Sequence, residues 1–485
     1  MTLPSHRDLY HGGAWHPPAR GRYLERTSPG TGEALGRIAD ATAEDVDAAV
    51  ASARAGFKIW SRLAARERGQ RLRQLGATLR QHADELALID AIDGGNPVRE
   101  LLHDIQIAAD QLELFAGLVT EIKGASVPLG PDAVHFSVRE PLGVVARIIA
   151  FNHPIMFCVA KLAAPLAAGN SVIVKPPEQA PLSALRFVEL VEGILPAGVV
   201  NVVPGGAQVG AALAGHPGVS KVALIGSVPT GRAVMRAAAE TIKPVMLELG
   251  GKNALIAFPD ADVDEVAAAA VAGMNFAWCG QSCGSTSRAF VHRAIYDAVL
   301  DRIPGLCRAF TPGLPGDMAT TMGALISKPH HDRVLAYVAA GRAEGARLLC
   351  GGEPPADPRL AGGFYLAPTV FADATPAMRI AREEIFGPVL TVLPWSDEDE
   401  MIDAVNSVSY GLTCAIWTRD LSAAHRTAAR VEVGYVWIND VSRHYLGTPF
   451  GGVKHSGIGR EECLGELLDF TQEKTIHIRV SPAKR

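Results

Sequence analysis

The sequence lacks any apolar stretch suited to crossing a lipid bilayer. The most apolar segment, residues 148–168, contains Asn152, His153, two prolines and Lys161, and a bilayer span of about 20 residues does not readily hold such groups. The first residues also lack an apolar core of signal-peptide length. We therefore expect a protein with no membrane partner.

Cysteine and excess charge of one sign are scarce as well. The seven cysteines are an odd number scattered over 485 residues, so a disulfide framework is disfavoured and a reducing, cytoplasmic location is expected. Lys and Arg number 46 against 51 Asp and Glu, for a formal net charge of −5 without a basic block, which argues against a nucleic-acid partner. With 48% apolar and 20% charged residues, the chain is expected to fold rather than stay disordered.

The pattern along the chain is that of an α/β protein with two or three domains. Thr42 is a plausible N-cap with Asp45 three positions later, and residues 42–120 carry helical periodicity, including amphipathic runs over 64–93 and 97–118. From residue 143, apolar runs alternate with helical ones, which indicates a parallel sheet covered on both faces. Such sheets bind ligands at the carboxyl ends of their strands. The expected strands are residues 143–150, 171–175, 199–203, 221–225 and 244–249.

A second α/β stretch extends over residues 254–440. An Ala-rich helix is expected over 261–277, with strands near residues 288–292, 388–395, 413–418 and 434–438. Residues 133–138 and 475–480 alternate between apolar and polar side chains, so each is expected to form an isolated strand. Together they predict a small separate sheet of the kind that subunits share.

Residues 280–284 fit two different nucleophile patterns. Gly280-Gln-Ser-Cys-Gly284 matches the G-x-S-x-G elbow of serine hydrolases, but that elbow needs a preceding strand, whereas residues 266–276 look helical. Cys283 is the better candidate, because a thiol in a Gly-flanked turn at a helix end can be activated. The alternative for any cysteine is a small buried apolar residue. We expect that role for Cys158, Cys279, Cys307, Cys350, Cys414 and Cys463.

Polar residues that follow the expected strands supply further candidates. Glu248 ends an apolar strand ahead of two glycines, and burial would raise its pKa toward that of a general base for water. Asn152 follows the first strand and could donate a hydrogen bond to an oxyanion. Taken singly, Glu248 also fits a surface glutamate, and Asn152 fits an ordinary turn.

Two segments suit parts of a nucleotide. Lys175 and Glu178 follow the second strand on one turn, where a cation and a carboxylate suit ribose hydroxyls or form a simple ion pair. The segment from Gly226 to Gly231 follows the fourth strand and opens a helix, a geometry that favours a phosphate at the helix N-terminus. The usual G-x-G-x-x-G fingerprint is missing from this segment.

Together and in this order, these motifs resemble those of the aldehyde dehydrogenase superfamily. Glu248-Leu-Gly-Gly-Lys252 and Gly280-Gln-Ser-Cys283 look like the family's glutamate and cysteine signatures, with 35 residues from Glu248 to Cys283. The resemblance covers residues 10–480. The further matching motifs are Asn152, Lys175 with Glu178, Gly226 with Gly231, Glu384-Ile-Phe-Gly-Pro388, Pro449-Phe-Gly-Gly452 and Ser456-Gly-Ile-Gly-Arg-Glu461.

This resemblance implies a particular domain organisation. A Rossmann-like parallel-sheet cofactor domain would comprise residues 1–120 and 141–248, and a second α/β catalytic domain would comprise residues 249–440. A small β oligomerisation arm would be formed by residues 121–140 and 441–485. The resemblance also implies a homodimer or a homotetramer built from dimers.

The resemblance further implies an NAD-dependent oxidoreductase that converts a small-molecule aldehyde to the carboxylic acid. Cys283 would form a thiohemiacetal and, after hydride loss, a thioester, while Asn152 and the Cys283 backbone N–H hold the oxyanion. Glu248 would activate water to hydrolyse the thioester, and its presence argues against a CoA-acylating enzyme. Lys161 and Glu461 match positions that relay protons from this base.

The cofactor expected from the resemblance is NAD, and no metal is expected. A carboxylate at Glu178 accepts a hydrogen bond from a ribose 2′-hydroxyl but repels a 2′-phosphate, so NADP is the less favoured cofactor. Departures from the family pattern at Phe151, Leu224-Ile225 and Trp278-Cys279 are expected to affect packing or pocket shape only. The positions assigned to the cofactor are Lys175, Glu178, Gly226, Ser227, Gly231, Leu249, Glu384 and Phe386.

The substrate positions leave the kind of aldehyde open. Small side chains such as Ala160 and Ala277 suggest a wide channel for an aromatic or bulky chain, whereas His153, Arg443 and His444 favour a polar or acidic tail. Two other functions compete: a serine hydrolase that uses Ser282, and an inactive scaffold that only binds. The positions assigned to the aldehyde channel are His153, Phe157, Ala160, Ala277, Ser282, Gly284, His444 and Phe450.

Overall fold

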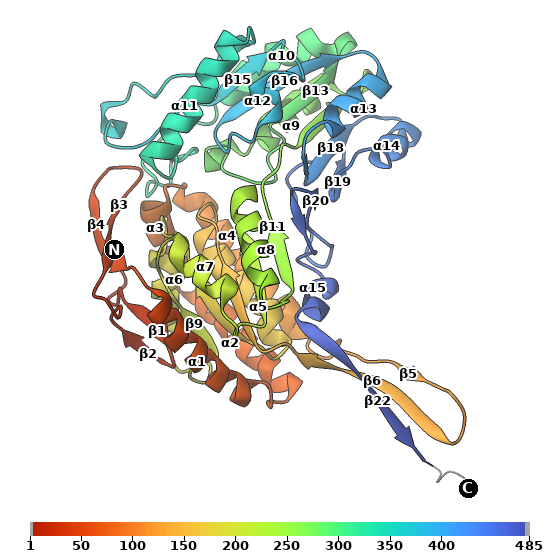
Figure 1. Cartoon of the computed structure of the whole chain (residues 1–485). Coiled ribbons are helices and arrows are strands. Elements are labelled where there is room, and N and C mark those ends of the chain that lie inside the picture. Colours follow the sequence, from red (N-terminus) through yellow and green to blue (C-terminus); the bar gives the residue numbers. More distant parts are fainter. Residues whose placement is uncertain (1–2, 481–485) are drawn as a thin grey trace.

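The computed structural model describes residues 3–480 and contains two large α/β units and a β arm (Figure 1). The first unit is built on an eight-stranded sheet with the order β2-β1-β9-β8-β7-β10-β11-β21. Its five central strands run parallel, as the apolar runs predicted. They are β7 (Val144–Ile148), β8 (Ser171–Lys175), β9 (Val200–Val202), β10 (Lys221–Ile225) and β11 (Val245–Glu248).

The edges of this sheet are short antiparallel strands that the sequence did not reveal. They are β1 (Leu9–His11), β2 (Ala14–His16) and β21 (Gly457–Ile458). A strand of two or three residues is too short to show a periodicity. β3 (Tyr23–Thr27) and β4 (Ala34–Ala39) form a separate hairpin.

Helices cover both faces of the first sheet. Val172 and Val174 of β8 pack into one apolar cluster with α2 to α6, whereas Ile173 packs on the opposite face with α1, α7 and α8. This period of two is what a strand buried on both faces requires. The helices are α1 (Ala43–Trp60), α2 (Ala65–Gln81), α3 (Ala83–Gly94), α4 (Val98–Gly117), α5 (Pro154–Ala167), α6 (Leu182–Val191), α7 (Ala207–Gly215) and α8 (Val228–Ala239).

The observed helices confirm one expectation from the sequence and contradict another. Thr42 and Asp45 form the predicted capping box at the start of α1. The predicted single run over 64–93 is wrong, because it is divided into α2 and α3 at His82, whose backbone leaves the helical conformation. The apolar pattern continues across this break, so periodicity alone does not reveal it.

The second unit has a seven-stranded sheet with the order β14-β15-β16-β13-β12-β18-β19. The sequence predicted β13 (Arg288–His292), β16 (Val389–Trp395), β18 (Thr413–Trp417) and β19 (Tyr435–Ile438). It did not predict the four-residue strands β12 (Ala254–Ala257), β14 (Arg347–Cys350) and β15 (Thr369–Ala372). The strand pairs are parallel except for β14 with β15. This parallel arrangement confirms the expected α/β class.

Helices again cover both faces of this sheet. One cluster joins the sheet to α9 (Val263–Gly273) and α10 (Arg293–Cys307), and another joins it to α13 (Glu398–Asn406) and α14 (Leu421–Ala428). The helix expected over 261–277 is shorter than predicted, since a separate 3-10 turn covers Phe276–Trp278. α11 (Lys328–Ala343) and α12 (Arg379–Arg382) complete the unit.

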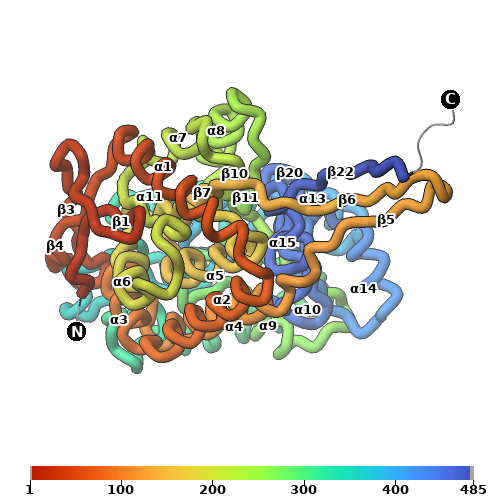
Figure 2. The backbone as a smooth tube through the Cα atoms, turned by 90° about the horizontal axis from the view of Figure 1, so that it is seen from below, coloured from red at the N-terminus to blue at the C-terminus, as the bar shows by residue number. Residues whose placement is uncertain are grey.

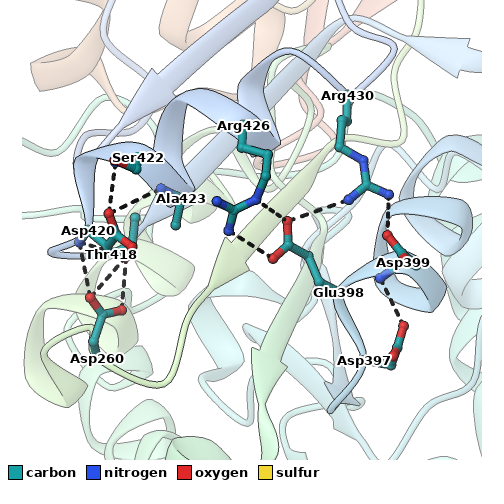
Figure 3. A network of polar contacts seen from close by, with 10 residues as sticks. All are labelled: Asp260, Asp397, Glu398, Asp399, Thr418, Asp420, Ser422, Ala423, Arg426 and Arg430. Carbon is teal, nitrogen blue, oxygen red and sulfur yellow. Dashed lines mark hydrogen bonds and ion pairs between the residues drawn. The ribbon is translucent and has the colours of Figure 1, made fainter.

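Charged side chains connect α13 and α14 at the surface (Figure 3). Asp420 caps α14 by accepting from the backbone N–H groups of Ser422 and Ala423. Asp260 accepts from the Thr418 hydroxyl and from the Asp420 backbone N–H. Arg426 of α14 pairs with Glu398 of α13, and Arg430, just after α14, pairs with Asp399 of α13. The turn before α14 is therefore held by its own Asp420 and by Asp260 from a distant segment.

The two isolated strands predicted far apart in sequence pair with each other. β6 (Ala133–Pro141) and β22 (Thr471–Arg479) run antiparallel, with Ser137 opposite Thr475, and β5 (Ser126–Val127) adds a third strand. Both views show these strands projecting away from the two α/β units (Figures 1 and 2). The segment that leads into β22 contains β20 (Val453–Lys454), which pairs with β17 (Tyr410–Gly411), and α15 (Leu464–Asp469).

Within residues 3–480, none of the helices combines the length and the apolar character that crossing a bilayer requires.

Candidate active site

Two cavities meet at a small set of shared residues. The sheet-edge cavity, about 720 Å³, lies beyond the carboxyl ends of β7, β8, β10 and β11. The aromatic cavity, about 550 Å³, lies against α4 and α5 and is lined by Phe157, Trp278, Trp437, Tyr445 and Phe450 among others. Both volumes are typical of small-ligand sites. The residues that line both cavities are Ile225, Glu248 and Cys283.

Cys283 lies in a tight turn that follows the 3-10 turn. Its backbone carbonyl accepts a hydrogen bond of 2.7 Å from Nδ2 of Asn253. Gly251 is required beside it, since a Cβ there would lie 2.7 Å from the same carbonyl oxygen. A Cβ on Gly250 would lie 2.1 Å from Oε2 of Glu384. The two glycines after Glu248 thus allow two different segments to approach this strand end closely.

Cys283 is half-buried, whereas five of the other six cysteines are buried. All seven are free thiols. Cys279 is fully buried in an apolar cluster, as expected for a packing residue. Cys350 is only half-buried, contrary to expectation, because β14 is the edge strand of its sheet. The remaining cysteines, Cys158, Cys307, Cys414 and Cys463, are buried as expected.

Glu248 and Cys283 have strongly shifted proton affinities. Burial raises the pKa of Glu248 to about 8, and the negative charge of Glu461 also raises it. The hydrogen bond from the Cys283 thiol and the charge of Lys161 lower the pKa by less. Burial and the nearby Glu248 also raise the pKa of the Cys283 thiol well above its usual value. Oε1 of Glu248 has no hydrogen-bond partner among residues 3–480. The site therefore pairs a protonated thiol with a carboxyl group that can take up or release a proton near neutral pH.

A buried ionic network lies behind Glu248. Nζ of Lys161 on α5 is 3.0 Å from Oε2 of Glu461. Arg147 of β7 contacts the other oxygen of Glu461 at 3.2 Å and Glu466 at 2.8 Å. Burial would lower the pKa of Lys161, but the charges of Glu461 and Glu466 outweigh it and raise that pKa. The sequence analysis missed Arg147 and Glu466, although an arginine within an otherwise apolar strand was a usable signal.

Asn152 follows β7, is 3% exposed and lines the sheet-edge cavity. Its backbone carbonyl accepts a 2.8 Å hydrogen bond from Nδ2 of Asn96, which fixes the turn between β7 and α5. Its side chain thus lies in the same cavity wall as Cys283 and Glu248.

Most of the residues expected to hold a cofactor line the sheet-edge cavity. Lys175 ends β8 and Glu178 follows it, while Gly226 and Ser227 follow β10. Ser227 is the N-cap of α8, so this helix presents its N-terminus to the cavity. Gly231 and Leu249 lie behind the wall instead, where a Cβ on Gly231 would be 2.7 Å from Cδ1 of Leu249.

Glu384 and Phe386 form the opposite wall, and α11 holds them there. Oε1 of Glu384 accepts a 2.9 Å hydrogen bond from the Gly251 backbone N–H. Arg333 donates to the Glu384 carbonyl at 2.7 Å, and Nε2 of His330 donates to the Phe386 carbonyl at 2.7 Å. Burial lowers the pKa of His330 to about 4, so this ring is neutral. The sequence analysis missed both α11 residues, since their partners lie about 50 residues away in the chain.

Most of the residues expected to bind the substrate line the aromatic cavity, but two do not. Ala160 and Ala277 are buried and do not appear among the wall residues of the aromatic cavity. Ser282 follows a 3-10 turn rather than a strand, so the strand-to-helix elbow of a serine hydrolase is not formed. The expected residues that line the cavity are His153, Phe157, Ser282, Gly284, His444 and Phe450, together with Arg443.

Comparison with known proteins shows similarity over nearly the whole chain. A sequence model of the aldehyde dehydrogenase family matches residues 15–476. Aldehyde dehydrogenase tropH of Talaromyces stipitatus is 52% identical over 490 residues, covering 99% of this chain and 95% of that protein. An NAD+ complex of a Bacillus cereus aldehyde dehydrogenase is 38% identical with a TM-score of 0.95, covering 98% and 97% of the two chains. An indole-3-acetaldehyde dehydrogenase of P. syringae in complex with NAD+ and IAA is 38% identical with a TM-score of 0.95, covering 99% and 97%.

Proposed function

This chain belongs to the aldehyde dehydrogenase family, and we propose that Cys283 and Glu248 carry out its reaction where the two cavities meet. That reaction is the oxidation of an aldehyde with NAD. The observation that carries the assignment is that both side chains line both cavities. A nucleophile and a base placed there reach a substrate from one side and a cofactor from the other.

Cys283 and Glu248 exchange a proton in the first half of the reaction. Sγ of Cys283 bonds to the aldehyde carbon, the carbonyl electron pair moves to oxygen, and the thiol proton passes to Glu248. The raised pKa values of both groups favour this direct transfer over a free thiolate. The Asn152 amide and the Cys283 backbone N–H stabilise the oxyanion, an interaction of about 3 kcal/mol at comparable sites.

Glu248 acts as the base in the second half. The chemistry that NAD supplies when bound is the acceptance of one hydride. Loss of that hydride from the thiohemiacetal leaves an acyl group on Sγ as a thioester. Glu248, after passing its proton toward Lys161 and Glu461, takes a proton from water. The resulting hydroxide attacks the thioester, the C–S bond breaks to release the carboxylic acid, and Glu248 gives the proton to the sulfur.

The sheet-edge cavity fits a dinucleotide. The α8 N-terminus at Ser227 suits the pyrophosphate, because its free N–H groups and helix dipole attract anions. Lys175 and Glu178 suit the adenine ribose, and Glu384 suits the second ribose. A carboxylate at Glu178 supports a preference for NAD over NADP. Gly231 and Leu249 contribute by close packing behind the pyrophosphate site.

The projecting arm supports a homodimer, or a homotetramer built from dimers. Its strands carry exposed apolar side chains, and β22 and β5 are open sheet edges. Open edges and exposed apolar residues are features that a second copy of the chain can cover. The exposed apolar residues on the arm are Val127, Leu129, Val134, Ile478 and Val480. We propose the same division into domains: a cofactor domain around the eight-stranded sheet, a catalytic domain around the seven-stranded sheet, and the arm.

A reducing, cytoplasmic location is part of the proposal. All seven cysteines are free, including several that are buried. Unpaired thiols in this number are more typical of a reducing compartment than of an oxidising one.

Covalent trapping on Cys283 tests the proposed function. The Glu248→Gln variant mixed with an aldehyde and NAD should release one NADH per site and accumulate an acyl adduct on the peptide that contains Cys283, detected by mass spectrometry. Cys283→Ala should show neither the NADH nor the adduct. An adduct on another residue, or NADH production by Cys283→Ala, would overturn the assignment.

A further inference from the structure

We propose that the aromatic cavity selects aldehydes that carry a hydroxyl group on an aromatic ring, and that His153, oriented by Asp104, binds this hydroxyl. This inference rests on the proposed function, because it assumes that the aldehyde carbon is held at Cys283. It concerns the ring of the substrate and its hydroxyl group, which take no part in the oxidation.

His153 and Asp104 form a well-defined polar pair in the cavity wall. Nδ1 of His153 lies 2.7 Å from Oδ2 of Asp104, whose side chain is 3% exposed. A carboxylate only accepts hydrogen bonds, so Nδ1 carries a proton, and whenever the ring holds a single proton Nε2 is an acceptor. Nε2 has no partner in the part of the chain that the structure describes, and His153 lines the cavity. The pair therefore offers an oriented acceptor for an O–H group.

The position of His153 in the chain places this acceptor beside the reacting centre. His153 directly follows Asn152, the proposed oxyanion residue, and consecutive Cα atoms are about 3.8 Å apart. Cys283 and His153 both line the aromatic cavity, so an aldehyde held at Cys283 extends the group attached to its carbonyl carbon into the cavity that His153 lines. A single ring between the carbonyl and the hydroxyl is the substrate geometry that we infer for this cavity.

Aromatic side chains around His153 suit a planar substrate. The His153 ring lies 5.1 Å from the Trp278 ring and 5.3 Å from the Phe157 ring, measured between centroids. His444 and Phe450 lie 4.3 Å apart on another part of the wall. Aromatic rings favour stacked or edge-to-face contacts at these separations. The cavity thus favours an aromatic ring over a flexible aliphatic chain.

The charges in the wall disfavour an acidic tail. The cations that line the cavity are engaged already: Lys161 pairs with Glu461, and Arg443 lies 3.7 Å from Asp440. His444 is paired with Glu462 at 3.2 Å. Carboxylates outnumber cations in the wall, so a substrate carboxylate would meet repulsion. The lining carboxylates are Glu100, Asp104, Asp110, Glu248, Glu461 and Glu462.

Matched benzaldehydes test this inference. We would measure kcat/KM with NAD for benzaldehyde, its 3- and 4-hydroxy and methoxy derivatives, and 4-carboxybenzaldehyde. One hydroxy isomer should exceed both its methoxy counterpart and benzaldehyde by about tenfold, the effect of one oriented hydrogen bond, and the carboxylate should be the poorest. In His153→Phe, which keeps a ring but removes both nitrogens, the hydroxy-to-methoxy ratio should fall to near one.

The control is His216→Phe. His216 also pairs with an aspartate, Asp47 at 3.0 Å, but lies outside both cavities, so the ratio should keep its wild-type value. An unchanged ratio in His153→Phe, or a wild-type preference for the carboxylate or the methoxy compound, would overturn the inference. Failure of the proposed function is distinct, because wild-type protein would then produce no NADH with any of these aldehydes.

Discussion

Lys161 and Glu461 form an ion pair with Nζ and Oε2 3.0 Å apart, and neither side chain is more than 6% exposed. Both charges act on Glu248, but in opposite directions. Glu461 raises the pKa of Glu248, whereas Lys161 lowers it, after the larger effect of burial. The pair therefore influences the pH at which the proposed base becomes active, besides offering a path for its proton.

Substitutions of this pair should move the pH profile in opposite directions. The base form of Glu248 increases with pH, so the rate of thioester hydrolysis should rise through a pH near 8. Glu461→Gln removes a negative charge and should shift this rise to lower pH, whereas Lys161→Met should shift it to higher pH. The measurement is the single-turnover rate of deacylation against pH. Shifts in the same direction would show that the two substitutions change the pKa of Glu248 by disturbing the fold and not through their charges.

Glu248 itself should control hydrolysis far more strongly than formation of the first NADH, because the thiol proton lost in the first half can also pass to water. In Glu248→Gln the first NADH should still form, while the steady-state rate should fall by about two to four orders of magnitude, the usual contribution of a general base. The remaining rate should also lose its rise near pH 8. Stopped-flow absorbance at 340 nm resolves the two phases. Loss of the first phase with intact steady-state turnover would assign the base to another residue.

Glu178 should determine the choice between NAD and NADP. Glu178→Gln removes the charge that repels a 2′-phosphate but keeps the length of the side chain, so the NADP-to-NAD ratio of kcat/KM should rise by about tenfold or more. Glu265→Gln in α9 is a matched control far from the sheet-edge cavity and should leave the ratio unchanged. A wild-type ratio that favours NADP would contradict the assignment of Glu178.

The sequence predicted long buried strands well, because continuous apolar runs reflect burial on both faces, as in β8 and β10. It did not predict β12 or β21, whose two to four residues carry little pattern. Motif positions such as Cys283 and Glu248 were recognised because their neighbours in the chain are also distinctive. Asp104 and His330 were not, since each contacts a site residue about 50 positions away. Such contacts depend on how elements pack, which local sequence does not record.

The turn before α14 should make a pH-dependent contribution to stability (Figure 3). Burial would raise the pKa of Asp260, but hydrogen bonds from Thr418 and backbone N–H groups outweigh it and lower this pKa. A carboxylate with a lowered folded-state pKa stabilises the fold above its unfolded pKa, and the effect is lost as pH falls through the folded value. Asp260→Asn should therefore reduce the free energy of unfolding at pH 7 by about 0.5–1 kcal/mol, since the group is exposed and screened.

Denaturant unfolding at several pH values tests this expectation for Asp260. The difference between wild type and Asp260→Asn should diminish below about pH 4, where the carboxylate is protonated in the unfolded chain. Asp399→Asn removes one exposed ion pair with Arg430 and should change stability much less at any pH. A pH-independent loss in Asp260→Asn would show that the hydrogen-bond geometry, not the charge, matters.

His330 should act as a positioning residue for the cofactor wall. Its neutral ring donates to the carbonyl of Phe386, a non-glycine residue with a φ of 56°, and this backbone region is unfavourable without such support. His330→Ala should therefore raise KM for NAD several-fold, while KM for the aldehyde changes little because the aromatic cavity does not include this residue. His330→Gln, which keeps an N–H donor, should restore most of the affinity. His331→Ala removes the neighbouring histidine, which contacts Tyr365 instead, and should leave KM for NAD unchanged. Equal changes in both KM values, or failure of Gln to rescue, would show that His330 supports the fold generally rather than the Phe386 wall.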